Sequence, residues 1–188
     1  MERNLFYSSD RKEWREWLAA HFETEKEVWF VFPAKLSGEP SILYNDAVEE
    51  ALCFGWIDGQ AGTLDETHLL RRFTPRRKGS PYSQPNIERL IWLEKQGMIH
   101  PKIRDEVLPV IQAPFLFPED ILKVLREDPV VWDNYQQFTD SYKRIRVAYV
   151  EAARKRPEEF QKRLRNFVEK TRLNKRIMGY GGIDKYYQ

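Results

Sequence analysis

The sequence predicts an α+β fold: a small N-terminal domain with the order helix, strand, helix, strand, strand, helix, followed by an all-helical C-terminal region. Three observations lead to this prediction. Hydrophobic residues recur at helical spacing in several segments, two β-rich segments are close enough to form an antiparallel hairpin, and helical patterns dominate from Phe117 onward. The chain has 188 residues, of which 41% are hydrophobic and 14% aromatic, a composition typical of a folded domain with a helical extension.

The first predicted elements are a helix over residues 10–22 and a strand over 28–32. Asp10 is a good N-cap residue, and Glu13 follows three residues later as in a capping box. Apolar side chains then recur near helical spacing at Trp14, Trp17, Leu18 and Phe22. The strand is β-branched and aromatic without polar alternation, which is typical of burial on both faces, and Pro33 limits it.

A second helix and a hairpin follow a predicted turn at 36–40. Asn45 is expected to cap the helix, and Gly55 is expected to end it. Residues 56–61 and 68–74 are predicted to pair as antiparallel strands because the segment between them is short. The alternation of side chains along a strand then puts Trp56, Asp58 and Gln60 on one face.

Helices account for the rest of the predicted structure. Ser83 is expected to cap a helix that stops at Gly97, which completes a domain over residues 1–100. Prolines concentrate over residues 101–117, which are therefore predicted to be a linker to a basic helical region over 118–188. First-turn prolines and the N-cap Asp128 predict helices over 118–126, 129–138, 140–155 and 157–176. The last of these carries an apolar stripe that is expected to pack on another element, Phe160, Leu164, Phe167 and Val168.

Charge divides the chain into two oppositely charged parts. Residues 141–188 contain 14 Lys and Arg against 5 Asp and Glu, whereas residues 1–140 contain 17 against 24. The basic part suggests nucleic-acid binding, with cations on phosphates and Tyr180, Tyr186 and Tyr187 stacking on bases. The alternative is that this part packs against the acidic part or is solvated, and the formal net charge of +2 favours this alternative.

The apolar segments and the single cysteine bear on the location of the protein. The longest apolar runs are far shorter than the roughly 18 residues that a membrane-spanning helix needs, so we expect no membrane insertion. The N-terminal residues lack the apolar segment of a signal peptide, which favours a cytoplasmic location. Cys53 lies at an apolar helix end and is expected to be a small buried hydrophobic residue.

The strongest functional signal is a basic stretch between the hairpin and the following helix. It holds five cations within eight positions and no acid: Arg71, Arg72, Arg76, Arg77 and Lys78. The last three lead into a predicted helix N-terminus, whose free N–H groups and positive dipole end favour an anion. Ser80, Ser83 and Asn86 add neutral donors, and arginine suits bidentate binding of phosphate or carboxylate. The simpler alternative is a solvated turn whose cations neutralise the acidic N-terminal part.

Asp58 is expected to lie beside this basic stretch, opposite Arg72 or a neighbouring residue according to the register of the hairpin. The simpler interpretation is an ion pair that stabilises the hairpin by about 0–1 kcal/mol if exposed. The alternative is a general acid or base. The known hydrolase, nucleotide-binding and zinc-protease motifs are absent, and the three histidines lack metal-ligand spacing, so the sequence indicates no metal and no cofactor.

Several uncommon sequence words occur in an order that resembles the YdeI/OmpD-associated, or bacteriocin-protection, family. They are a Trp-x-x-Trp-Leu helix at 14–18, Glu-Val-Trp at 27–29, Glu-Ala-Leu-Cys-Phe-Gly-Trp-Ile-Asp-Gly at 50–59, and Arg-Phe-x-Pro-Arg-Arg-x-x-Ser-x-x-Ser-x-x-Asn at 72–86. The resemblance covers most of residues 10–100, and the helical C-terminal region is similar in kind to the second segment of that family. Tyr82 departs from the pattern, which usually has Trp there. The family name comes from association with an outer-membrane porin and from protection against bacteriocins, and the resemblance implies no catalytic role for any residue.

Three functional hypotheses follow. The first is a binding protein, linked to bacteriocin or stress protection, that takes an anionic small molecule or an acidic group of a protein partner; its site would contain Trp56, Asp58, Arg72, Arg76, Arg77, Ser80, Tyr82, Ser83 and Asn86. Arg76 and Arg77 would clamp the anion, while Trp56 and Tyr82 would form walls. The second is an enzyme with Asp58 as general acid or base. The third is a nucleic-acid or protein adaptor that uses the helices of residues 141–188. The sequence specifies neither the ligand nor the oligomeric state.

Overall fold

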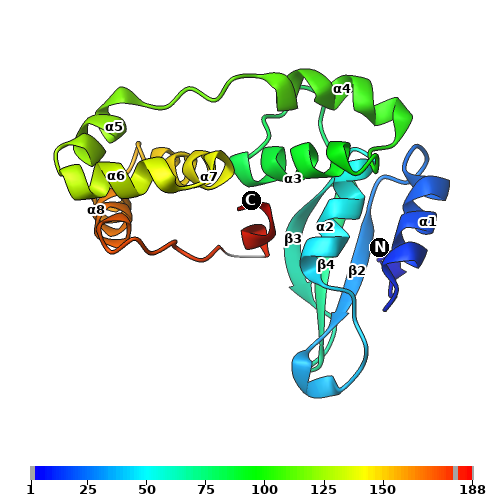
Figure 1. The fold of residues 1–188 in the computed structure, drawn as a ribbon. Coiled ribbons are helices and arrows are strands. Elements are labelled where there is room, and N and C mark those ends of the chain that lie inside the picture. Colours follow the sequence, from blue (N-terminus) through cyan, green and yellow to red (C-terminus); the bar gives the residue numbers. More distant parts are fainter. Residues whose placement is uncertain (1–2, 180–181, 188) are drawn as a thin grey trace. The chain divides into compact units, whose positions relative to one another are not determined.

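The computed structural model describes residues 3–179 and 182–187, and these divide between two compact units (Figure 1). The first unit contains the described residues up to Tyr82 together with Leu90–Val110. The second contains Ser83–Arg89 together with the described residues from Ile111 onward. All strands of the described residues lie in the first unit and helices form most of the second, so the α+β prediction is confirmed.

The first unit is built on a sheet with the strand order β1-β2-β4-β3. Its elements up to the hairpin are β1 (Leu5–Phe6), α1 (Arg11–His21), β2 (Val28–Pro33), the 3₁₀ turn η1 (Lys35–Ser37), α2 (Tyr44–Cys53), β3 (Trp56–Thr63) and β4 (His68–Pro75). β1 pairs with β2 in parallel, while β2 pairs with β4, and β4 with β3, in antiparallel fashion. The predicted hairpin is confirmed, and β1 is an additional short edge strand.

The register of the hairpin differs from simple alternation. Asp58 lies opposite Phe73, and the pairing shifts between Asp58 and Ala61. Such a bulge places two residues of one strand against one of its partner and redirects the side chains that follow. The sequence-based assignment of side chains to faces therefore holds only for the first part of β3.

The core of the first unit lies between the sheet and the helices α1 and α2. Trp14 of α1 is fully buried, and its ring centroid lies 5.1 Å from that of Phe30 and 5.4 Å from that of Phe73. The Trp14 indole donates a hydrogen bond of 3.1 Å to the carbonyl of Ala47 on α2. Buried indole N–H groups need such partners, so this bond fixes α1 against α2 while the rings contribute large apolar area.

Of the two N-caps predicted for the first helices, Asp10 is confirmed and Asn45 is not. Asp10 caps α1, because its side chain accepts a 2.7 Å hydrogen bond from the backbone N–H of Lys12. α2 instead begins at Tyr44, with Leu43 at the N-cap and no side-chain cap. The predicted cap, Asn45, lies inside the helix and donates to Glu49 at 2.9 Å, because a buried carboxylate one turn away offers it a partner.

The segment predicted as a linker contains a helix. α3 (Gln84–Lys95) ends near Gly97 as predicted, and α4 then covers Pro101–Gln112. Pro101 begins α4 at a position where its missing N–H costs nothing, and Pro109 is accommodated inside the helix. The linker prediction for 101–117 is therefore wrong for 101–112, and only the residues between Gln112 and α5 lack helical structure.

The second unit consists mainly of helices. They are α5 (Glu119–Arg126), α6 (Pro129–Gln137), α7 (Asp140–Glu151), α8 (Pro157–Arg172) and the 3₁₀ turn η2 (Ile183–Tyr186). The helices α5 to α8 follow one another through connections of two to five residues. Asp128 caps α6 as predicted and accepts from the N–H of Val130 at 2.8 Å. Pro129 and Pro157 take first-turn positions, so the predicted helix starts are correct within one residue.

Two internal polar contacts fix α7 within the second unit. Arg144 donates to both carboxylate oxygens of Glu88, at 2.6 and 2.8 Å, and Glu88 is almost fully buried. Arg146 donates to the hydroxyl of Tyr187, which is also buried. A bidentate arginine–carboxylate pair of this kind is both strong and directional, so Glu88 ties the first turns of α3 to α7.

Candidate functional site

Of the two arrangements that the sequence left open for Asp58, the structure has the one in which Asp58 lies opposite a neighbour of Arg72, namely Phe73. The Asp58 carboxylate accepts a short hydrogen bond from the hydroxyl of Tyr44 at the start of α2. Arg72 lies opposite Trp29 of β2, and its Nε donates to Glu27, two residues before Trp29, at 2.8 Å. No ion pair between Asp58 and Arg72 forms, because residues adjacent in β4 point to opposite faces and Arg72 therefore projects from the face opposite to Asp58.

Trp56 is part of the core. Its side chain is 0% exposed, and its indole N–H donates to the carbonyl of Phe22 at 3.1 Å. Its ring meets that of Trp17 edge-on, with 5.9 Å between centroids. Trp56 therefore does not form a wall of a ligand site as expected, because its side chain is fully buried in the core.

The loop over residues 76–82 is shaped by Arg76. Its Nη2 donates to the carbonyls of Ser80 and Pro81, both at 3.0 Å, and to the hydroxyl of Ser80 at 3.2 Å. The guanidinium carbon lies 3.6 Å from the ring centroid of Tyr82, a close cation–π contact. The structure thus brings Arg76, Ser80 and Tyr82 together, whereas Arg77 is exposed.

Ser83 and Asn86, the remaining predicted site residues, belong to the second unit. Ser83 is exposed, and its backbone carbonyl accepts from the N–H of Ile87 at the start of α3. The side-chain carbonyl of Asn86 accepts from Nη1 of Arg89 at 2.9 Å. Both residues thus form hydrogen bonds within the first turns of α3.

A hollow of about 350 Å³ lies in the first unit beside the β3–β4 turn, lined by Leu5, Tyr7, Val31, Glu39, Leu64, Asp65 and His68. His68 lies between two carboxylates, with Nδ1 at 2.9 Å from Asp65 and Nε2 at 3.2 Å from Glu39. The hydrogen bond from His68 lowers the pKa of Asp65 to about 2, and the same bond raises the pKa of His68. This arrangement stabilises the turn. Among the described residues, no group of three or more His, Cys, Asp or Glu side chains is placed to hold a metal ion.

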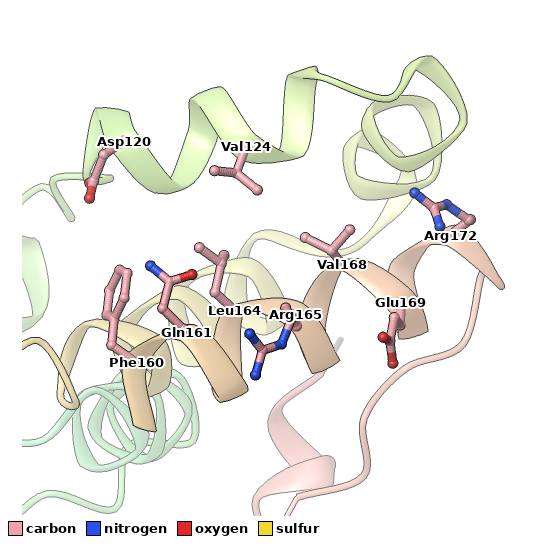
Figure 2. A pocket seen from close by; sticks show the side chains of 9 residues that line it. All are labelled: Asp120, Val124, Phe160, Gln161, Leu164, Arg165, Val168, Glu169 and Arg172. Carbon is pink, nitrogen blue, oxygen red and sulfur yellow. The ribbon is translucent and has the colours of Figure 1, made fainter. Parts of the chain in front are cut away.

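A groove lies in the second unit between α5 and α8 (Figure 2). It has a volume of about 470 Å³ and an apolar floor made by Val124, Phe160, Leu164 and Val168. Both helices pack against α6, so that Val124 points across the groove toward Leu164 and Val168, as Figure 2 shows. Val124 and Val168 are half-buried, which leaves part of their apolar surface for a partner.

Ion pairs bound the groove at both ends. At the end near Phe160, Arg154 pairs with Asp120 at 2.8 Å and lies 4.8 Å above the Phe160 ring. The hydrogen bond from Arg154 lowers the pKa of Asp120. At the other end Arg172 pairs with Asp128 at 2.9 Å. These pairs fix the side chains that define the length of the groove.

The outer edge of the groove along α8 carries charges of both signs. Arg165 and Glu169 lie one helical turn apart, and both are exposed. Neither forms an ion pair with any residue in 3–179 or 182–187. The groove therefore combines an apolar floor with one cation and one anion that are available to a partner, which is the usual composition of a recognition site.

Two of the three tyrosines expected to stack on nucleic-acid bases are buried. Tyr186 and Tyr187 are each only 4% exposed, and Tyr180 lies outside the described residues. Several cations of this region also have acidic partners within the second unit, including Arg144, Arg154 and Arg172. Five of the fourteen cations of residues 141–188 thus have an acidic partner within the part of the chain that the structure describes: Lys143, Arg144, Arg154, Arg163 and Arg172.

The two parts of the chain match different family models. Residues 6–106 match the family described as "Domain of unknown function (DUF8412)", and since this match covers more than half of the sequence, the chain belongs to that family. Residues 114–174 match the family described as "Bacteriocin-protection, YdeI or OmpD-Associated". The groove between α5 and α8 lies entirely within this second match. Searches of curated proteins and of solved structures gave no match.

The resemblance to the YdeI/OmpD-associated family is confirmed, but the match lies elsewhere than the motif words indicated. Those words fall in residues 10–100, which match the DUF8412 model, whereas the YdeI/OmpD-associated match begins at residue 114. The helices of the described residues include none that is long and apolar enough to span a membrane.

Proposed function

We propose that this protein is a binding protein whose contact site for a protein partner is the groove between α5 and α8. The observation that carries the proposal is a groove of about 470 Å³ with an apolar floor, which lies within the residues that match the YdeI/OmpD-associated family. The description of that family speaks of association, which agrees with a binding role. The partner would insert apolar side chains between Val124 and the α8 residues Leu164 and Val168.

The size of the groove sets the expected affinity. Full burial of one large apolar side chain contributes about 1.5–3 kcal/mol, and a groove of this volume has room for a few such anchors. The loss of translational and rotational freedom on association offsets much of that gain. We therefore expect micromolar binding of a short segment, which suits a reversible contact.

The proposal is tested by selecting peptides from a displayed random library on the full-length chain. The wild-type chain should enrich peptides with several large apolar residues. Val124→Asp should abolish the enrichment, because it places a carboxylate on the half-buried floor without disturbing the fully buried core. The matched control is Leu116→Asp, which makes the same kind of change at a residue of the second unit that is 83% exposed. Equal enrichment on Val124→Asp and on the wild type would overturn the proposal.

The predicted anion site is a second candidate, now restricted to the loop over residues 76–82. Only Nη2 of Arg76 is used in its hydrogen bonds to the described residues, so Nε and Nη1 are available to an anion. Arg77 is exposed beside it. Inorganic phosphate should raise the melting temperature of the wild type but not of Arg77→Ala, and an equal rise in both would exclude this site.

The other two hypotheses from the sequence are tested separately. A catalytic role for Asp58 requires that Asp58→Asn abolish turnover while binding is retained. A nucleic-acid adaptor role requires binding of an oligonucleotide that falls steeply with added salt. The cytoplasmic location and the link to bacteriocin or stress protection likewise stay predictions.

A further inference from the structure

The groove between α5 and α8 has the length of a short helix. Its floor residues on α8 run from Phe160 to Val168, which at about 1.5 Å per residue corresponds to roughly 12 Å. The ion pairs of Arg154 and Arg172 mark its ends. An occupant would therefore contact the floor over two to three helical turns.

The walls of the groove favour a helical occupant over an extended one. Both walls are helices, whose backbone N–H and C=O groups are already bonded within α5 and α8. An extended segment on this apolar floor would leave its own backbone groups without partners, which is costly in a buried contact. A helix satisfies its backbone internally and presents anchors at i, i+4 and i+7 along one face, which can contact the row of Phe160, Leu164 and Val168.

The exposed edge of α8 adds a requirement on charge. Arg165 and Glu169 have no ionic partner in the described chain and lie one turn apart. A helix beside α8 would place its own flanking positions opposite these two side chains. One acidic and one basic residue at those positions would pair with Arg165 and Glu169. Two residues of the same charge would repel either Arg165 or Glu169.

We infer that the partner segment is an amphipathic α-helix of two to three turns with apolar anchors on the groove floor, an acidic residue against Arg165 and a basic residue against Glu169, one turn apart. This inference rests on the proposed function of the groove. The apolar anchors provide most of the affinity. The charges select the partner, because each exposed pair changes binding by only about threefold.

The test uses synthetic helical peptides of about fifteen residues with the same leucine anchors and three kinds of flanking pair: Glu with Lys, two Lys, or two Glu. Binding to the full-length chain is measured by fluorescence anisotropy. The wild type should prefer the mixed pair by about threefold. Arg165→Glu makes the edge doubly acidic and should shift the preference to two Lys, while Glu169→Arg should shift it to two Glu.

Three controls make the result decisive. Lys162→Glu carries the same charge change on α8 at an exposed residue that does not line the groove, so it should keep the wild-type preference. A mixed-pair peptide with a central proline should lose binding by at least about tenfold, because proline breaks the helix. Val124→Asp should abolish binding of all peptides.

The outcomes separate this inference from the proposed function. An unchanged peptide preference in Arg165→Glu and Glu169→Arg, or full binding of the proline peptide, would overturn the inference while loss of binding in Val124→Asp still supported the groove. Binding that survives Val124→Asp would place the peptides elsewhere and overturn both proposals, as would the failure of every peptide to bind the wild type.

Discussion

Glu50 on α2 is expected to be one of the most sensitive polar positions of the first unit. Its side chain is 1% exposed and accepts from Nε of Arg11 at 2.5 Å and from Nη1 of Arg15 at 2.6 Å. Arg15 also donates to the carbonyl of Met98 at 2.7 Å. Replacing Glu50 by Gln keeps the volume of the side chain but removes the charge that both guanidinium groups face.

The contacts of Glu50 set the magnitude of the effect. A hydrogen bond to a charged group contributes about 1.5–3 kcal/mol, and the substitution weakens two of them. Arg11 and Arg15 are 29% and 35% exposed, so both can regain part of their solvation, and Arg11 keeps an ion pair with Glu49. We therefore expect Glu50→Gln to lower the free energy of unfolding by about 3 kcal/mol and the melting temperature by about 6–12 °C.

Urea unfolding followed by tryptophan fluorescence measures this loss. The matched control is Glu106→Gln, which removes the same charge at an exposed residue of α4 and should change stability by less than about 0.5 kcal/mol. The double variant Arg11→Gln with Glu50→Gln should be less destabilised than the sum of its single variants, because the two side chains are in contact. A Glu50→Gln variant as stable as the control would refute the reasoning.

Three further predictions concern single groups. Burial raises the pKa of the Cys53 thiol to about 12, so a thiol reagent at pH 8 should label the unfolded chain and not the native one; rapid native labelling would contradict this. The ion pair of His68 with Asp65 should stabilise the turn fully between about pH 4 and pH 6.5, because the pKa of Asp65 is lowered to about 2 and that of His68 is raised. Its contribution should fall as pH drops toward 2 or rises through the native pKa of His68, and an NMR titration that places this pKa below the ordinary histidine value would exclude the pair. Arg76→Lys should remove the contact with the Tyr82 ring and increase amide exchange in the loop over 76–82, with unchanged exchange as the opposing result.

Local sequence signals predicted the helix ends correctly where a single residue, such as an N-cap or a glycine, determines where the helix begins or ends. Asp10 and Asp128 are N-caps as expected, and Gly97 has the positive φ of 66° that a helix stop requires. α4 was missed because its prolines indicate a break, although Pro101 begins the helix and Pro109 is tolerated within it. Local propensity does not reveal the tertiary contacts that keep such a helix intact.

The candidate site was harder to predict because it depends on contacts between distant residues. The bulge after Asp58 and the hydroxyl of Tyr44 decide where the carboxylate lies, and neither follows from the spacing of residues in β3. The groove pairs α5 with α8, about forty residues later in the chain. One signal did exist, because Val168 next to Phe167 widens the apolar stripe of α8 beyond what packing on one neighbour needs.

The pairing of Glu88 with Arg144 joins residues 56 positions apart. The two family matches divide the chain between residues 106 and 114, yet the compact second unit includes residues 83–89. A fragment limited to residues 114–174 would lack Glu88, so Arg144 would be partly buried without its carboxylate partner. The family match and the compact unit therefore have different borders, and we expect that transplanting the C-terminal segment into another protein would require the beginning of α3 as well.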